Sequence, residues 1–170
     1  DSLAFVSIDG LYRAMGEKAR NTACPQHCDA CFTGEYPTRL TDYAEQKALE
    51  HFVRGTVYTP AAQIYAALGT NAPADTGAGG TEVSGGGYSR KAVSFGSYSG
   101  RQIAGSADLL WSAGADWGAI TTLSLHDASS GGNMLAFGSI SPIPTVVNGG
   151  SVAIAAGQLV VECLKYGPWL

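Results

Sequence analysis

Short apolar runs separated by glycine-rich turns fill most of the chain after about residue 60. The runs are rich in Val, Ile, Leu and aromatic residues, and each has the length of an ordinary strand. They span residues 63–69, 119–126, 134–140, 151–155 and 159–164. Runs of this kind bounded by Gly, Asn and Ser are typical of strands. The pattern therefore predicts an all-β fold, a β-sandwich or jelly roll of about seven or eight short strands.

Two further strands are expected between these runs, and both carry irregularities. Residues 88–95 alternate cleanly only in their second half, so we expect one flank of that strand to meet a partner or solvent. Residues 101–111 contain Gly105, which predicts a local irregularity in the strand. The segment 127–133 consists largely of Ser, Gly and Asn, and is therefore expected to be a hairpin connection.

The segment before the first run has helical periodicity instead. It predicts an amphipathic helix over residues 42–54, with Asp42 and Glu45 at the spacing of a capping box and Gly55 as the stop. We expect the apolar stripe of this helix to lie on the sheet or on a neighbouring protein. The stripe consists of Ala44, Ala48, Leu49, Phe52 and Val53.

Residues 1–40 have a different character, and we treat them as a segment separate from the helix and β module of residues 41–170. This first segment is expected to be irregular, and it carries Cys24, Cys28 and Cys31 close together. Thiolates at this spacing suit a metal ion or an iron–sulfur cluster. Free thiols or a disulfide, with the fourth cysteine of the chain as a distant partner, are the alternative.

Residues 1–42 resemble the carboxy-terminal end of glutamine amidophosphoribosyltransferase, the first enzyme committed to purine synthesis. The resemblance rests on Asp1-Ser-Leu-Ala-Phe-Val-Ser-Ile-Asp-Gly-Leu11 and on Cys28-Asp-Ala-Cys31-Phe-Thr-Gly-Glu-Tyr-Pro37-Thr-Arg-Leu-Thr-Asp42. In cluster-bearing members of that family, the cysteines that match Cys28 and Cys31 supply part of the ligand set. The remaining ligands, the nucleophilic cysteine and the phosphoribosyl-diphosphate loop have no counterpart here, so the resemblance implies no enzyme activity.

A second resemblance, over residues 41–163, is to a family of small virion structural proteins of tailed phages. Members are described as decoration, minor tail or fibre-like proteins, so the resemblance implies a component of the particle and leaves its location open. The motifs that carry it are Tyr43-x-Glu45-x-Lys47-x-Leu49, Arg54-Gly-Thr-Val-Tyr58-Thr-Pro60, Glu82-Val-Ser-Gly-Gly-Gly-Tyr88 with Arg90, and Ala115-Asp-Trp117-Gly118.

Composition narrows the classes of function. Only 14% of the residues are charged, against about 25% in ordinary soluble domains. A surface with so few charges is typical of a subunit that is largely covered by neighbouring subunits. The net charge of -4 argues against nucleic acid as a partner, because phosphate binding requires a clustered basic face. No apolar run approaches the roughly 20 residues of a membrane span, so no membrane partner is expected.

No arrangement of residues predicts catalysis. Ser124, His126 and Asp127 are close in sequence, but in a strand Asp127 points away from the other two. The glycines at 85–87 lack the Gly-Lys-Ser/Thr ending of a phosphate loop and lead into a strand. We therefore expect no enzyme activity and no cofactor.

The sequence predicts instead a protein that works through contacts with other virion proteins. The favoured hypothesis is a capsid decoration or cement subunit, a homo-oligomer that binds the major capsid protein and stabilises the head of the virion. The first alternative is a tail or fibre-base protein, and the second is a metal or iron–sulfur module built on the three clustered cysteines. The residues expected to contact partners are Gly85, Gly86, Gly87, Tyr88, Arg90 and Trp169.

Overall fold

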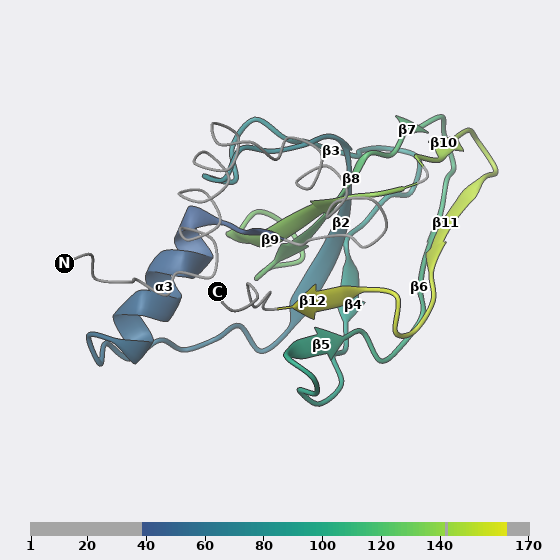
Figure 1. The fold of residues 1–170 in the computed structure, drawn as a ribbon. Helices are drawn as coiled ribbons and strands as arrows, with labels where there is room; N and C mark the ends of the chain where they lie inside the picture. The colour runs from purple at the N-terminus through teal and green to yellow at the C-terminus, as the bar shows by residue number, and fades with distance from the viewer. Residues whose placement is uncertain (1–38, 142, 163–170) are drawn as a thin grey trace, which may run out of the picture.

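A six-stranded antiparallel sheet lies at the centre of the fold (Figure 1). Strand β2 is its longest member, and it pairs with β8 along one edge and with both β3 and β4 along the other. In spatial order the sheet contains β1 (Arg39–Leu40), β9 (Met134–Ser139), β8 (Thr122–His126), β2 (Ile64–Asn71) and β3 (Thr81–Glu82), with β4 (Lys91–Val93) beside β2.

The computed structural model describes residues 39–141 and 143–162. Residues 1–38 lie outside the described part, and with them the clustered cysteines Cys24, Cys28 and Cys31. Residues 163–170, which include Trp169, lie outside it as well.

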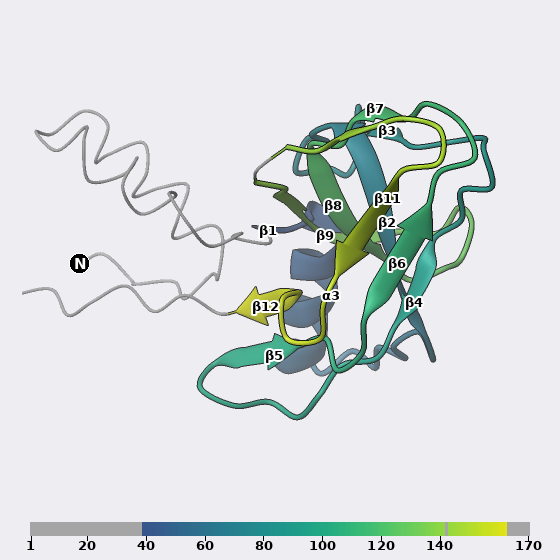
Figure 2. The ribbon, with the colours of Figure 1, turned by 90° about the vertical axis from the view of Figure 1, so that its right-hand side faces the viewer.

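Three two-stranded antiparallel ribbons complete the described part of the chain. They pair β6 with β11, β5 with β12, and β7 with β10. Figure 2 shows the β6–β11 ribbon in front of β2 and β8, where it forms a second layer over the sheet. The bounds are β5 (Gln102–Ala104), β6 (Leu109–Ser112), β7 (Gly118–Ala119), β10 (Thr145–Val146), β11 (Ser151–Ile154) and β12 (Val160–Glu162).

The hydrophobic core draws on both layers. Ala66 pairs with Leu125 across β2 and β8, and Leu68 follows Ala66 on the same face because side chains alternate along a strand. Trp111 of β6 is 1% exposed and belongs to the same cluster. The buried members are Ala66, Leu68, Val83, Val93, Leu109, Trp111, Ala113, Trp117, Ile120, Leu125, Ala136, Val146, Val152 and Leu159.

The all-β fold that the sequence predicts is confirmed, with one helix in the ranges 39–141 and 143–162. Strands β2, β8, β9, β11 and β12 lie where the five apolar runs predict them. Two expected strands prove shorter. The segment 101–111 is divided into β5 and β6 by residues 105–108, which belong to neither strand, so the irregularity expected at Gly105 is present. Of residues 88–95, only β4 pairs as a regular strand.

The predicted helix is present as α3 (Asp42–Phe52), and its cap requires a correction. The N-cap is Thr41 and not Asp42, because the Thr41 hydroxyl accepts a hydrogen bond from the N–H of Ala44 at 3.4 Å. The same hydroxyl donates to the carbonyl of Met134 at 2.5 Å, and Thr41 is fully buried. Threonine and aspartate both suit an N-cap. The hydrogen bond from Thr41 to Met134 of β9 favours Thr41 over Asp42 in this position.

The apolar stripe of α3 is only partly covered. The helix contacts β9 and β1, yet none of its residues is fully buried. Leu49, Phe52 and Val53 are 53%, 82% and 76% exposed. Three of the five stripe residues thus face outward in the described part of the chain. No helix there is long and apolar enough to cross a membrane.

Backbone pairing begins before the boundary that we placed between residues 40 and 41. Arg39 pairs with Phe137 and Leu40 pairs with Ala136. Leu40 also packs against the core cluster. The first strand of the sheet therefore starts at Arg39.

We expect Thr41→Val to destabilise the fold, because valine keeps the volume of threonine but neither caps α3 nor donates to Met134. The loss should be about 1–2 kcal/mol in the free energy of unfolding, measured by urea denaturation. Thr70→Val is the matched control, since the Thr70 hydroxyl makes only a 3.5 Å contact with the carbonyl of Thr81. Equal losses in the two variants would contradict the role assigned to Thr41.

Candidate partner-contact site

The segment between β3 and β4 contains every predicted contact residue except Trp169. It runs over residues 83–90, has no regular pairing of its own, and contains three consecutive left-handed glycines. Their φ angles are 75° at Gly85, 55° at Gly86 and 77° at Gly87. Glycine suits such angles because side chains with a Cβ are strained there.

The glycine turn packs closely against the chain that follows β6. The carbonyl of Gly86 accepts a hydrogen bond from the N–H of Gly114 at 2.8 Å. A Cβ at Gly86 would lie 2.6 Å from the backbone nitrogen of Ala115, whereas a Cβ at Gly85 or Gly87 would meet nothing within 4 Å. Gly86 is therefore required for an internal contact, and its two neighbours face outward.

Tyr88 joins this turn to the sheet. Its hydroxyl accepts a hydrogen bond from the N–H of Leu68 at 2.9 Å and donates to the Glu82 carboxylate at 3.0 Å. Its ring meets that of Trp117 edge-on, with centroids 5.7 Å apart. Burial, partly offset by the bond from Leu68, and then the charge of Glu82 raise the pKa of the Tyr88 phenol. The hydroxyl therefore stays a neutral donor.

Two tryptophans also donate hydrogen bonds to the segment 83–90. The indole N–H of Trp117 donates to the carbonyl of Gly85 at 3.3 Å, and that of Trp111 donates to the carbonyl of Ser89 at 3.0 Å. Both indoles are buried in the core. Their donors thus find partners in an irregular segment, which satisfies the polar groups on each side.

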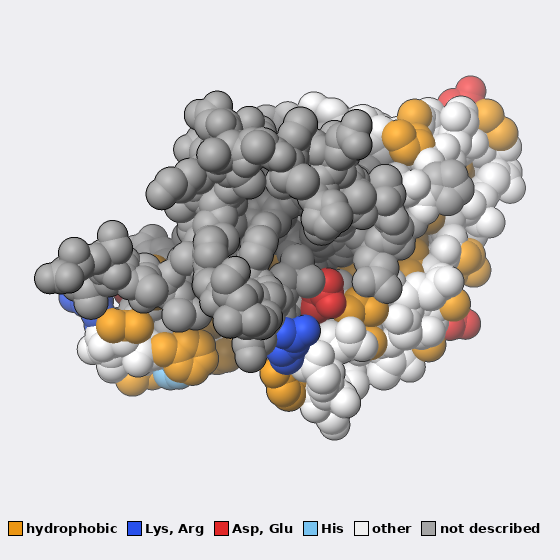
Figure 3. Space-filling view, in the orientation of Figure 1, with side chains coloured by type: hydrophobic (Ala, Val, Ile, Leu, Met, Phe, Trp, Pro, Cys, Tyr) orange, Lys and Arg blue, Asp and Glu red, His pale blue; other side chains and the backbone are white. Residues whose placement is uncertain are grey.

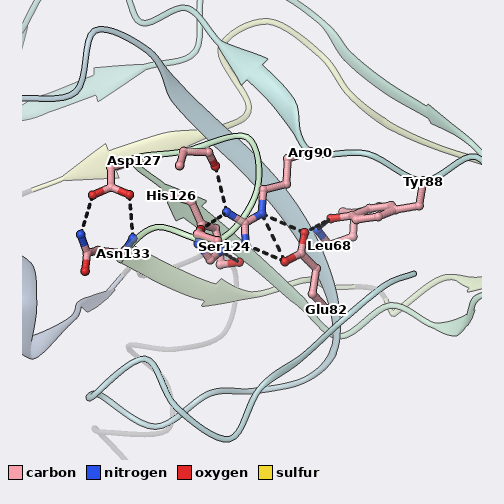
Figure 4. A network of polar contacts seen from close by, with 10 residues as sticks. Leu68, Glu82, Tyr88, Arg90, Ser124, His126, Asp127 and Asn133 are labelled. Carbon is pink, nitrogen blue, oxygen red and sulfur yellow. Dashed lines mark hydrogen bonds and ion pairs between the residues drawn. The ribbon is translucent and has the colours of Figure 1, made fainter. Parts of the chain in front are cut away.

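Arg90 is the centre of a network of polar contacts (Figure 4). Its guanidinium donates to both oxygens of the Glu82 carboxylate, with the shortest contact at 2.8 Å. It also donates to the carbonyls of Ala128 and Gly131, at 2.9 and 2.8 Å, in the connection between β8 and β9. The Arg90 side chain is only 8% exposed. Partial burial raises the pKa of Glu82, but the hydrogen bonds from Arg90 and Tyr88 outweigh it and hold that pKa below its usual range.

Ser124 and His126 form a buried pair beside this network. Ser124 Oγ lies 3.0 Å from His126 Nε2, while His126 Nδ1 has no hydrogen-bond partner among the described residues. The Asp127 carboxylate is directed at Asn133, with contacts of 2.6 and 2.8 Å to its backbone and side-chain nitrogens. Asp127 therefore does not orient the imidazole, and the arrangement is not that of a Ser-His-Asp triad.

Sequence reasoning singled out this segment but did not indicate that the Tyr88 and Arg90 side chains point inward. The structure brings Glu82, Tyr88 and Arg90 together, and it leaves Gly85 and Gly87 on the surface. No group of three His, Cys, Asp or Glu residues in the described ranges is placed to hold a metal ion. Large apolar side chains that the pattern alone did not place on the surface are Phe52, Val53, Val57 and Tyr98.

We expect Gly86→Ala to destabilise the chain far more than Gly85→Ala. Both replacements place alanine at a positive φ, which costs about 1 kcal/mol. At Gly86 the added Cβ also collides with Ala115, so the total loss should be about 2–4 kcal/mol. Urea denaturation of the two variants measures the difference. Equal losses would show that the turn yields freely and is not packed as described.

Stability should fall in mild acid through His126. Burial, followed by the positive charge of Arg90, lowers the pKa of His126 from 6.5 to about 4. The unfolded chain thus binds a proton that the folded chain excludes, so stability is complete above about pH 6.5 and declines toward pH 4. The expected loss between pH 7 and pH 4.5 is roughly 2–3 kcal/mol.

His126→Gln should remove most of this decline, and urea denaturation of both proteins at the two pH values tests it. The pKa values of the Glu82 and Asp127 carboxyls are lowered in the folded chain, so the stability that they contribute is lost at lower pH than the His126 contribution. An unchanged decline in the variant would show that His126 is not its source.

Part of the chain is similar to amidophosphoribosyltransferases over a short stretch. The enzyme of Rhizobium etli is 67% identical over 42 residues, which cover 25% of this chain and 8% of that enzyme. The enzyme of Bacillus subtilis is 48% identical over 40 residues, again 8% of its length, and that of Drosophila melanogaster is 45% identical over 47 residues, 9% of its length. The predicted resemblance is confirmed. A match to so small a share of the enzymes does not establish their activity for this chain.

The second predicted resemblance is confirmed over most of the chain. Residues 39–162 match the family described as podophage GP4 fiber I protein gp80. The chain belongs to this family and is a structural protein of a phage.

Proposed function

We propose that this chain is a homo-oligomeric component of a phage tail fibre or fibre base, and that it acts through contacts with other virion proteins. The family match over residues 39–162 carries the proposal. Because the family description speaks of a fibre, it supports the tail or fibre-base alternative over the capsid decoration that we favoured from the sequence.

The packing of the described residues suits such a role. The polar side chains of Glu82, Tyr88 and Arg90 are joined to one another, so these groups are already paired within the chain. A protein that repeats in a particle gains from a fixed shape, since ordering flexible segments on binding reduces affinity. We place the functional unit at residues 39–162, which the family match spans.

The alternative of a metal or iron–sulfur module stays a prediction. Its ligands would be Cys24, Cys28 and Cys31, which lie outside the described residues. Metal analysis of the full chain tests it, with iron or zinc near one per chain as the supporting result.

The proposed location is tested by separating purified particles into heads and tails and quantifying peptides of this chain in each fraction. We expect the chain with the tails, in several copies per particle. Peptides of the major capsid protein and of a tail-tube protein serve as controls for the separation. Enrichment with the heads would overturn the fibre proposal in favour of capsid decoration, and absence from particles would overturn both.

A further inference from the structure

The outer layer of the fold ends in an open strand edge at β11. On its second side β6 contacts β4, whereas β11 pairs with β6 alone among the described residues. Figure 2 shows β8 and β9 behind β11 and continuing past its free side. The sheet beneath therefore extends farther than the layer that covers it.

The backbone groups on the open edge of β11 belong to Ser151 and Ala153. The N–H of Ala113 donates to the carbonyl of Gly150 at 2.8 Å, and these two residues continue the register of β6 with β11. Bonded and non-bonded pairs alternate in an antiparallel ladder, so the N–H and C=O groups of Ser151 and Ala153 point away from β6. Within the described part of the chain, no backbone group binds them.

Both ends of this open edge are closed by contacts within the chain. The N–H of Gly149 donates to the carbonyl of Ala113 at 2.8 Å. The N–H of Ala155 donates to Gln158 Oε1 at 3.1 Å, and the carbonyl of Ala155 accepts from the N–H of Gln158 at 3.0 Å. The open groups thus form one short row over residues 151–153.

The edge of β11 lacks the features that usually prevent pairing with another chain. Proteins protect open edges with charged residues, proline, bulges or very short strands. The sequence of β11 is Ser-Val-Ala-Ile, its register with β6 is regular, and no charged residue occurs from Ala128 to Val161. Figure 3 shows mainly hydrophobic and uncharged side chains at the right of the view, over β6 and β11.

Other strand edges in the described ranges are protected. The strands β1, β3, β4 and β12 each contain a charged residue, and β5, β7 and β10 have only two or three residues. In these ranges, β11 is therefore the edge best suited to receive a further strand.

We propose that an extended segment of a neighbouring virion protein adds to the open edge of β11 as a further strand. Its backbone would bind the free N–H and C=O groups of Ser151 and Ala153, which only another extended backbone matches in spacing. This inference rests on the proposed function, contact with other virion proteins, and names the place of one such contact.

The faces of β11 define the side chains of the partner strand. Val152 and Ile154 face the core, and an added strand continues this layer over the sheet below, where Leu40 and Leu123 are only partly buried. Because side chains alternate along a strand, the partner should be apolar at every second position. Its other positions lie beside the uncharged outer face of β11, so charged residues are not required there.

A single extended segment fits this edge better than the same edge of a second copy. The sheet formed by β8 and β9 extends past β11, so two folded copies joined edge to edge at β11 would bring these sheets into overlap (Figure 2). An added strand requires a width of only about 4.8 Å. The described strands of a second copy are all held in sheets of their own and are not available as such a segment.

Hydrogen exchange at single amides of the full chain tests the open edge. In the free protein we expect the amides of Ser151 and Ala153 to exchange about tenfold faster than those of Val152 and Ile154, which face β6. In purified particles the first two should become as slow as the others. Equal exchange in the free protein would overturn the assignment of the edge, and unchanged fast exchange in particles would overturn the proposed partner.

Ala153→Pro removes one open N–H and leaves the bonds to β6 in place. We expect the copies of this variant per particle to fall about tenfold, because proline cannot donate to an added strand. Ala153→Ser is the matched control, since it keeps the N–H and should be incorporated normally. Urea denaturation shows whether both variants fold. Normal incorporation of folded Ala153→Pro would overturn the proposal, and the exchange measurement decides alone if that variant does not fold.

A photo-reactive benzoyl-phenylalanine at position 153 identifies the partner. In particles we expect cross-links to an extended segment of a different virion protein. The same group at position 98 is the control, since Tyr98 is 65% exposed outside the β6–β11 ribbon and should not link to that segment. Cross-links only to copies of this chain would overturn the proposal. Enrichment of the chain with the heads would overturn the fibre location instead and leave these cross-links unchanged.

Discussion

The Arg90 guanidinium joins three parts of the chain that are far apart in sequence. It binds the Glu82 carboxylate at the end of β3 and two carbonyls of the β8–β9 connection, from its own position before β4. Because its side chain is only 8% exposed, removing any one of these partners would leave a buried donor unsatisfied. The charge-assisted contacts with Glu82 are the strong part of this network. The edge of the sheet at β3 and β4 depends on it.

Side-chain hydrogen bonds replace regular pairing along the segment that precedes β4. Tyr88 binds the backbone of β2, and Trp111 and Trp117 bind the carbonyls of Ser89 and Gly85. The segment is irregular by secondary structure, yet its polar groups meet defined partners. The large apolar side chains that are exposed lie outside this segment, at the end of α3 and at Tyr98, Leu110, Ile143 and Val147.

The fold was largely predictable from the sequence, because hydrophobic runs with strand length are strong local signals. The apolar runs at 63–69 and 134–140 became β2 and β9, and the helical periodicity after Asp42 became α3. The N-cap at Thr41 was not predictable, since its second bond goes to Met134, which is 93 positions away. Periodicity also showed that α3 has an apolar stripe without showing what covers it.

The candidate site was predictable only as a location. Consecutive glycines followed by Tyr88 and Arg90 marked an unusual segment, but the partners that turn these side chains inward are distant in sequence. Ala128 and Gly131 lie 38 and 41 positions from Arg90, and Leu68 lies 20 positions from Tyr88. Such pairings follow from strand order and register, which no local pattern encodes. Arg101 at a positive φ gave no signal at all, because its neighbours in sequence are ordinary hairpin residues.

Hydrogen–deuterium exchange tests the account most directly, with the chain measured free at low concentration and assembled in the particle. It asks whether the segment 83–90 is held by contacts within the chain while other residues contact the neighbouring virion proteins. We predict that amides at Tyr88 and nearby positions are protected equally in both states. Residues outside this segment that expose large apolar side chains, such as Phe52 and Val57, should gain protection only on assembly. New protection on assembly that is confined to residues 84–90 would contradict the account, because it would place the partner on the segment described here as closed from within.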